Sequence, residues 1–184
     1  MVTQLKSSLP RNTRFRGVVV ILLLLQCISV SATLAASPTM SQVMPLLQGY
    51  EWRDRPDAFL NLGEGTDQVL MDIAANADGY AVIRFRALAA LRYFANPQVA
   101  LFLENRIARE DAADMLRREL EAYVFAFGND QPARVAQTTE PLLDHPDAQI
   151  RMRAAVTLQK LPRSAVSQRV QQLLDSGSLA TGLE

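Results

Sequence analysis

The sequence predicts an all-α protein: a short right-handed α-solenoid of about three helix pairs, with a helical cap at the N-terminal end. The main observation is an internal repeat, because the pattern of residues 81–94, AVIRFRALAALRYF, returns 67 residues later in DAQIRMRAAVTLQKL, residues 147–161. In both segments apolar residues recur at spacings of four, four and three, which places them on one stripe of a helix. No strand-like alternation interrupts this period over the repeated region.

A middle copy of the motif lies between these two segments. Residues 115–127, MLRRELEAYVFAF, align with the first copy at an offset of 33. The three stripes are Ile83, Ala87, Leu91 and Phe94, then Leu116, Leu120, Val124 and Phe127, then Ile150, Ala154, Leu158 and Leu161. A repeat of this length is typical of stacked helix pairs, each of which completes its core against its neighbours.

Each copy is followed by a second predicted helix. The first copy breaks at Asn96 and Pro97, and the next helix is expected to run to Arg109, since proline is favoured in the first turn of a helix. The corresponding helices of the other copies are residues 132–143 and the segment after Pro162. These pairs make up a repeat domain over residues 66–175.

The pattern of the N-terminal segment predicts a signal peptide over residues 1–35. A basic head, with Lys6 and three arginines, precedes an uncharged run at residues 17–36. That order, ending in small residues before a cut after Ala35, is typical of an export signal. We therefore expect an exported protein, periplasmic or extracellular. The alternative is an uncleaved inner-membrane anchor formed by residues 17–36, because about 20 residues can span a bilayer.

The two ends of the remaining chain differ from the repeats. Residues 36–65 are expected to form a linker and an N-terminal cap, with Trp52 as a lid over the first repeat, because the end repeats of such arrays need a cover for the core. Residues 176–184 carry Gly and Ser without a periodic apolar face and are expected to be a flexible tail.

The segment His145–Leu161 resembles the first half of a HEAT-like repeat of the short type. Its matching residues are Pro146 and Asp147 before the helix, the pair Ile150 and Arg151, and then Ala154, Ala155 and Leu158. The resemblance covers residues 80–174 and is weakest in the middle copy, where Glu119 replaces the second arginine. It implies an armadillo-type α-solenoid. A tetratricopeptide array has a similar period, but its Trp, Leu-Gly, Tyr and Ala pattern is missing here.

One arginine recurs in every copy, at Arg84, Arg117 and Arg151. The resemblance implies that these three form an arginine ladder, each pairing with an acidic residue at a neighbouring turn. Available partners include Asp147, with Asp111, Asp114 and Asp144. A guanidinium suits this role because its planar fork holds carboxylates and carbonyls together. An anion-binding groove is the functional alternative.

The residues that catalysis and metal binding usually require are scarce. The sequence has one histidine, His145, in a turn, and one cysteine, Cys27, within the predicted signal peptide. We therefore expect no catalytic residues, no metal site and no cofactor. Residues 36–184 carry 15 Arg and Lys against 19 Asp and Glu, a net charge of −4 that argues against nucleic-acid binding.

The function expected from these observations is protein binding. Stacked helix pairs offer an extended surface, so we expect a non-catalytic adaptor, assembly factor or regulator in the cell envelope. Its partner is another protein or peptide, bound along the second helices, and the candidate contact residues are Phe102, Arg106, Arg109 and Arg134. A membrane enters only if the N-terminal segment stays uncleaved. The alternatives are an accessory subunit of a lyase-like enzyme and a structural part of a membrane-anchored complex.

Overall fold

The computed structural model describes residues 37–177, and all regular structure over that range is helical. The α-helices are α2 (Met40–Leu47), α3 (Pro56–Leu60), α4 (Thr66–Ala75), α5 (Ala81–Leu91), α6 (Pro97–Ile107), α7 (Ala113–Phe127), α8 (Pro132–Thr139), α9 (Ala148–Gln159) and α10 (Gln168–Asp175). Two 3₁₀ helices, η1 (Glu140–Asp144) and η2 (Arg163–Ala165), follow α8 and α9. The all-α prediction is confirmed for this part of the chain.

Several predictions from the sequence lie outside the described residues. They are the signal peptide at 1–35, the alternative anchor at 17–36 and most of the tail, 178–184. Within residues 37–177, none of the helices has the length and apolar character that crossing a bilayer requires.

Local sequence explains where the helices begin and end. The Asn96 side chain accepts hydrogen bonds from the backbone N–H groups of Gln98 and Val99, at 3.1 and 3.0 Å, and so caps α6. Asp147 caps α9 in the same way. Proline occupies the first turn of α3, α6 and α8, where it removes no helical hydrogen bond. The predicted helix at 132–143 is split, because its second half, which contains Pro141, is the 3₁₀ helix η1.

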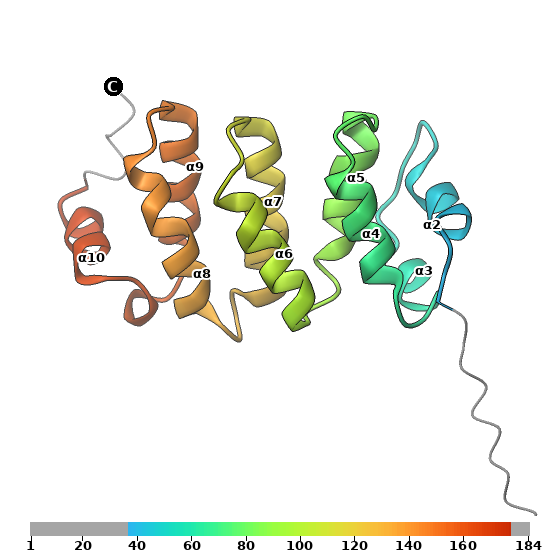
Figure 1. Cartoon of the computed structure of the whole chain (residues 1–184). Coiled ribbons are helices and arrows are strands. Elements are labelled where there is room, and N and C mark those ends of the chain that lie inside the picture. The colour runs from blue at the N-terminus through green and yellow to red at the C-terminus, as the bar shows by residue number, and fades with distance from the viewer. Residues whose placement is uncertain (1–36, 178–184) are drawn as a thin grey trace, which may run out of the picture. The chain divides into compact units, whose positions relative to one another are not determined.

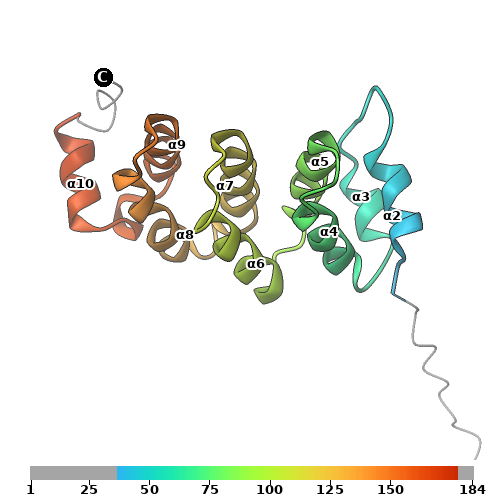
Figure 2. The same ribbon diagram turned by 45° about the horizontal axis from the view of Figure 1, so that its top comes forward.

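The helices pack in two rows. Helices α5, α7 and α9 contact one another in sequence, and so do α4, α6 and α8 (Figures 1 and 2). Contacts between the rows join α4 to α5, α6 to α7, and α8 with η1 to α9. This arrangement, over the described residues, is compatible with a helical repeat.

The pairing of helices differs from the one that the sequence suggested. Each arginine-bearing helix was expected to pair with the helix that follows it, but α5 packs closely against α4, which precedes it, and has few contacts with α6. Both helices carry small buried residues, Ala74 on α4 and Ala87 and Ala90 on α5. The distance between two packed helices depends on the size of the side chains at their contact.

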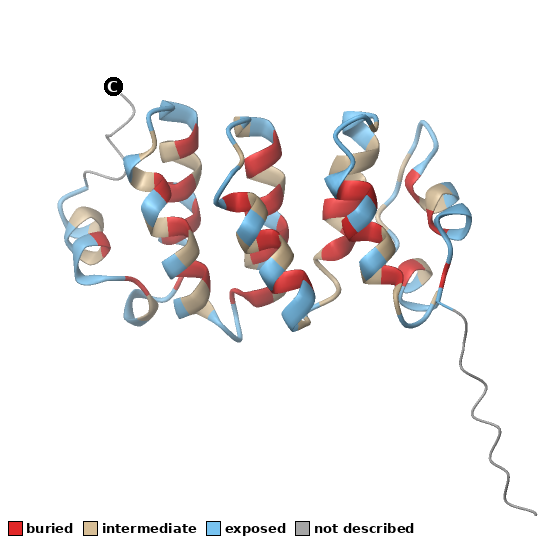
Figure 3. Ribbon diagram, viewed as in Figure 1, coloured by how far each residue is buried: buried red, intermediate tan, exposed pale blue. Residues whose placement is uncertain are grey.

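The core lies where the two rows meet (Figure 3). Nine of the twelve stripe residues are buried, and Ile83, Phe94 and Val124 are half-buried against the same cluster. The second helices contribute Val99, Leu103 and Ile107 from α6 and Val135 from α8. Apolar burial, which stabilises by roughly 25 cal/mol per Å² removed from water, therefore holds the rows together.

Residues 37–62 cover the first end of this core. Helices α2 and α3 contact each other, and α2 contacts α4 and α5. The Arg86 guanidinium on α5 donates to the carbonyl oxygens of Leu47 and Gly49 at 2.7 and 3.0 Å and lies 5.5 Å from the centre of the Trp52 ring. Trp52 is half-buried, and its indole N–H donates to the Leu46 carbonyl at 2.9 Å. Arg86 thus fastens this segment to α5.

Candidate functional site

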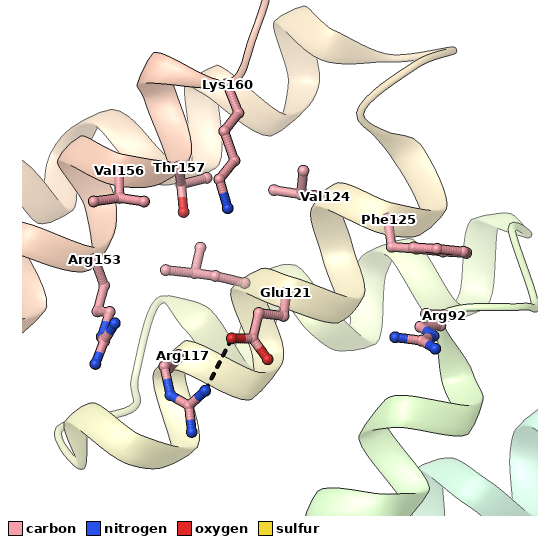
Figure 4. A pocket seen from close by; sticks show the side chains of 10 residues that line it. Arg92, Arg117, Glu121, Val124, Phe125, Arg153, Val156, Thr157 and Lys160 are labelled. Carbon is pink, nitrogen blue, oxygen red and sulfur yellow. Dashed lines mark hydrogen bonds and ion pairs between the residues drawn. The ribbon is translucent and has the colours of Figure 1, made fainter. Parts of the chain in front are cut away.

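A groove of about 370 Å³ runs along the outer side of α7 and α9 (Figure 4). Its lining residues come from the end of α5, from α7 and from α9: Arg92, Arg117, Leu120, Glu121, Val124, Phe125, Arg153, Val156, Thr157 and Lys160. We call this feature the α7–α9 groove. It lies on the row of first helices, whereas the sequence pointed to the second helices.

The apolar part of the groove is accessible to solvent. Phe125 is 56% exposed and Val156 is 41% exposed. Between them lie Val124, which is half-buried, and Leu120, which belongs to the core. Exposed apolar side chains grouped in a hollow and rimmed by charge are typical of binding surfaces.

Phe125 is held in place from its other side. The Arg92 guanidinium carbon lies 4.7 Å from the centre of the Phe125 ring, and Tyr93 meets the same ring edge to face at 5.6 Å. Arg92 is in turn paired with Asp54, which also accepts a hydrogen bond from the Tyr93 hydroxyl at 2.6 Å. Partial burial and this hydrogen bond to Asp54 raise the pKa of Tyr93. The exposed ring therefore stands on a fixed support.

The cations of the groove fall into two groups. In the first group, Arg92 is neutralised by Asp54, and Arg117 pairs with Glu121 at 3.0 Å. The Glu121 carboxylate also contacts Arg118 at 3.3 Å. Arg153 and Lys160 have no side-chain hydrogen bond or ion pair within residues 37–177. Glu121 is the one acidic residue of the described lining, so the groove carries an excess of positive charge.

Comparison of the three repeats makes Arg153 distinctive. It occupies the register of Arg86 in the first copy and of Glu119 in the second. Arg86 holds the carbonyls of Leu47 and Gly49, and Glu119 is fully buried against Arg106. Only in the third copy does this position carry a charge without a partner in the described chain.

A second hollow of about 400 Å³ continues the groove past the C-terminal end of α7. Val124 and Lys160 line both hollows, and the second is completed by Gly128, Asn129, Leu161 and Pro162. The recess is therefore elongated, with an apolar floor and Lys160 at its middle.

Three of the four predicted contact residues lie together, two of them on α6 and Arg109 just after its end. Phe102, Arg106 and Arg109 line a hollow of about 280 Å³ with Asn105 and Glu110. Arg109 is exposed, but the Arg106 side chain is only 18% exposed and donates to Glu119 at 2.5 Å and to Glu110 at 3.1 Å. Much of the charge on Arg106 is thus used within the fold.

The pair of Arg106 and Glu119 has an unusual electrostatic setting. The Glu119 side chain is fully buried, and its Oε2 atom has no hydrogen-bond partner in the described structure. Burial raises the pKa of Glu119 to about 7, although the Arg106 guanidinium lowers it. An ionised Glu119 is therefore costly near neutral pH.

Arg134, the fourth predicted contact residue, lies apart from the other three. Its guanidinium donates to both carboxylate oxygens of Glu104, at 2.5 and 3.1 Å. Partial burial raises the pKa of Glu104. Hydrogen bonds from Arg134 and Tyr123 lower this pKa by more, so that it lies below the ordinary value. Burial and the bond to Glu104 raise the pKa of Tyr123 to about 12. This network links α6, α7 and α8.

The arginines of the predicted ladder bind carbonyls as well as carboxylates. Arg84 donates to the Ala74 carbonyl at 3.2 Å, and Arg151 donates to the carbonyls of His145 and Pro146 at 2.9 and 2.8 Å. Arg117 pairs with Glu121 on its own helix. Asp147, expected as a partner, is instead the N-cap of α9.

Residues 37–177 do not bring a cluster of metal-ligating side chains together. No group of three or more His, Cys, Asp and Glu side chains in that range could hold a metal ion. The His145 Nδ1 atom accepts the backbone N–H of Asp147 at 3.1 Å, and so stabilises the turn before α9.

Comparisons with protein-family models, with curated proteins and with solved structures found no match to this chain.

Proposed function

We propose that the chain is an exported, non-catalytic α-solenoid of short HEAT-like helix pairs that binds a segment of another protein in the α7–α9 groove. It would act as an adaptor, assembly factor or regulator in the cell envelope. The motif repeated at offsets of 33 and 67 residues and the two rows of helices support the repeat architecture. The basic and then apolar pattern of residues 1–35 supports export.

One observation carries the binding proposal. Arg153 and Lys160, without partners in the described chain, stand on the same groove as the exposed rings and methyl groups of Phe125 and Val156. Binding interfaces commonly combine a buried aromatic anchor with a polar rim. This groove offers both, and its aromatic residue is already fixed by Arg92 and Tyr93.

Site-specific photo-cross-linking tests this proposal in the native host. A photoreactive phenylalanine analogue replaces Val156 in the groove, and a matched variant carries it at Leu101 on α6, which is 57% exposed and lies outside the groove. We expect a cross-linked partner from position 156 and not from position 101, and its loss when Arg153 and Lys160 are both changed to Ala. Equal cross-linking from both positions would contradict the proposal. So would cross-linking from position 156 that persists when Arg153 and Lys160 are both changed to Ala.

A further inference from the structure

We infer that the occupant of the α7–α9 groove is an extended acidic segment of the partner, with an aliphatic or aromatic side chain between its carboxylates. This inference rests on the proposed function and goes further, because it names the chemistry of the bound segment. It follows from the charge, the apolar surface and the elongation of the groove.

The charge of the groove selects carboxylates. Arg153 and Lys160 lie on one side of the groove, on and just after α9, and no carboxylate of the described chain neutralises them. On the opposite side, Glu121 is paired with Arg117 and Arg118, so its negative charge is already neutralised within the chain. Complementary charge steers association and suppresses wrong partners, so an acidic segment is favoured over a basic one.

The apolar surface requires more than charge from the segment. Exposed ion pairs contribute little on their own because water and salt screen them. Phe125, Val124 and Val156 offer an apolar contact beside the free cations. A leucine, isoleucine or phenylalanine of the partner would cover these residues. Little ordering cost falls on Phe125, because Arg92 and Tyr93 already fix its ring.

The elongation of the recess favours an extended segment over a compact ligand. The groove and the second hollow share Val124 and Lys160, so a chain that crosses the groove can continue towards Asn129 and Pro162. Lys160 at the junction can then meet a carboxylate from either part of the segment (Figure 4). An extended peptide of several residues spans such a recess, since each residue adds about 3.3 Å.

A nucleic acid is the other polyanion that could meet these cations, and the charge distribution disfavours it. Residues 36–184 carry more acidic than basic residues, and Glu121 stands inside the groove itself. Nucleic acids are bound by continuous basic surfaces, which neutralise many phosphates and release their counterions.

Selection from a phage-displayed library of random peptides of about 12 residues, on the immobilised full-length chain, tests the inference because such peptides are long enough to span both hollows. Selected peptides are then measured by fluorescence anisotropy. We expect Asp and Glu to be enriched around one Leu, Ile or Phe. For a selected peptide, replacing Asp and Glu by Asn and Gln should weaken binding at least about tenfold, and raising the salt from about 50 to 300 mM should weaken it several-fold.

Matched variants assign the binding to this groove. R153A with K160A, and separately F125A, should each weaken the selected peptide by about tenfold or more, because charge and anchor act together. R169A is the control: Arg169 on α10 is an exposed cation that pairs with Asp144 and lies outside the groove, so R169A should leave binding unchanged. Circular dichroism of each variant separates loss of binding from loss of folding.

The outcomes separate the inference from the proposed function. Groove-dependent peptides that are neutral or basic would overturn the inference and leave the proposed function intact. A failure to select any peptide whose binding depends on Arg153, Lys160 or Phe125 would overturn both. Tighter groove-dependent binding of a single-stranded oligonucleotide than of any acidic peptide would also overturn the inference.

Discussion

Arg86 and Arg153 occupy the same position of the repeat and have opposite surroundings. Arg86 holds two carbonyls of the N-terminal cap, whereas Arg153 faces the α7–α9 groove without a partner in the described chain. We therefore expect R86A to lower the free energy of unfolding by about 1 kcal/mol, because charged hydrogen bonds are lost at a partly exposed site. R153A should change it by less than about 0.5 kcal/mol.

Urea unfolding of the two variants beside the wild-type protein checks this prediction. In a peptide-binding measurement, R153A should have the larger effect and R86A the smaller one. A selected peptide should bind R86A as it binds the wild type and bind R153A more weakly. Equal destabilisation by both substitutions would mean that Arg153 has a structural role after all.

Glu119 predicts a dependence of stability on pH. Its pKa in the folded protein is raised from 4.5 to about 7, so the folded state holds this proton more tightly than the unfolded state does. The resulting stabilisation is complete below pH 4.5 and is lost as the pH rises through about 7. E119Q stays neutral, so its stability relative to the wild type should rise by roughly 2–3 kcal/mol between about pH 5 and pH 8.

Urea unfolding at several pH values measures this difference directly. E121Q is the matched control, because Glu121 lies on the same helix and its side chain is half exposed. A difference between E119Q and the wild type that stays constant with pH would show that Glu119 does not titrate in this range.

At the scale of the element, Asp147 has two possible roles that can be told apart: N-cap of α9, or partner of an arginine in the predicted ladder. Its carboxylate accepts the N–H groups of Gln149 and Ile150 at 2.7 and 3.4 Å, and Arg151 binds carbonyls instead. Asparagine caps helices about as well as aspartate, while alanine does not. We expect D147A to lose about 1 kcal/mol of stability and D147N to lose only a few tenths.

Thermal unfolding followed by circular dichroism is sufficient to compare the two variants. Equal losses for D147A and D147N would favour the ladder, since a pairing with Arg151 depends on the negative charge and not on the cap geometry.

For the elements, the sequence was informative about which residues face inward and uninformative about which outer faces meet. The period of 3.6 placed Val99, Leu103 and Ile107 of α6 in the core, where the structure has them. It could not show that α5 packs on α4 more closely than on α6, because the period of one helix does not specify which neighbouring helix covers its apolar face.

The groove was missed for the same reason. Phe125 lies next to the stripe residue Val124, and its ring contacts Arg92 and Tyr93 just after α5, which the period of one helix does not specify. Arg153 belongs to the repeated motif, and it differs from Arg86 and Glu119 in having no partner in the described chain, which the sequence does not show. Arg106 read as outward facing, because its carboxylate partner Glu119 lies on the next helix. The sequence does carry one signal of the groove, which is the aromatic residue Phe125 at a position outside the apolar stripe.

At the scale of the whole molecule, an array in which each helix pair contacts only its neighbours should unfold unevenly. Leu158 is fully buried in α9. L158A should cost about 2–5 kcal/mol, as other large-to-small core substitutions do. If the chain is a repeat array, amide exchange should accelerate most in α8, α9 and α10, and less in α4 and α5.

Hydrogen exchange with mass spectrometry resolves these segments. L70A provides the mirror image, because Leu70 is fully buried in α4 at the other end of the array. A uniform rise of exchange in both variants would indicate one cooperative globule and would argue against the α-solenoid.

The support of Phe125 has a consequence for protein engineering. The ring stands on Arg92 and Tyr93, and these are tied to Asp54, which precedes α3. The proposed recognition surface on α7 and α9 is therefore not a portable module of two helices. A graft of those helices onto another scaffold would transfer Arg153 and Lys160 but leave the aromatic side chain free to rotate. A successful transplant would have to carry the chain from Asp54 onward.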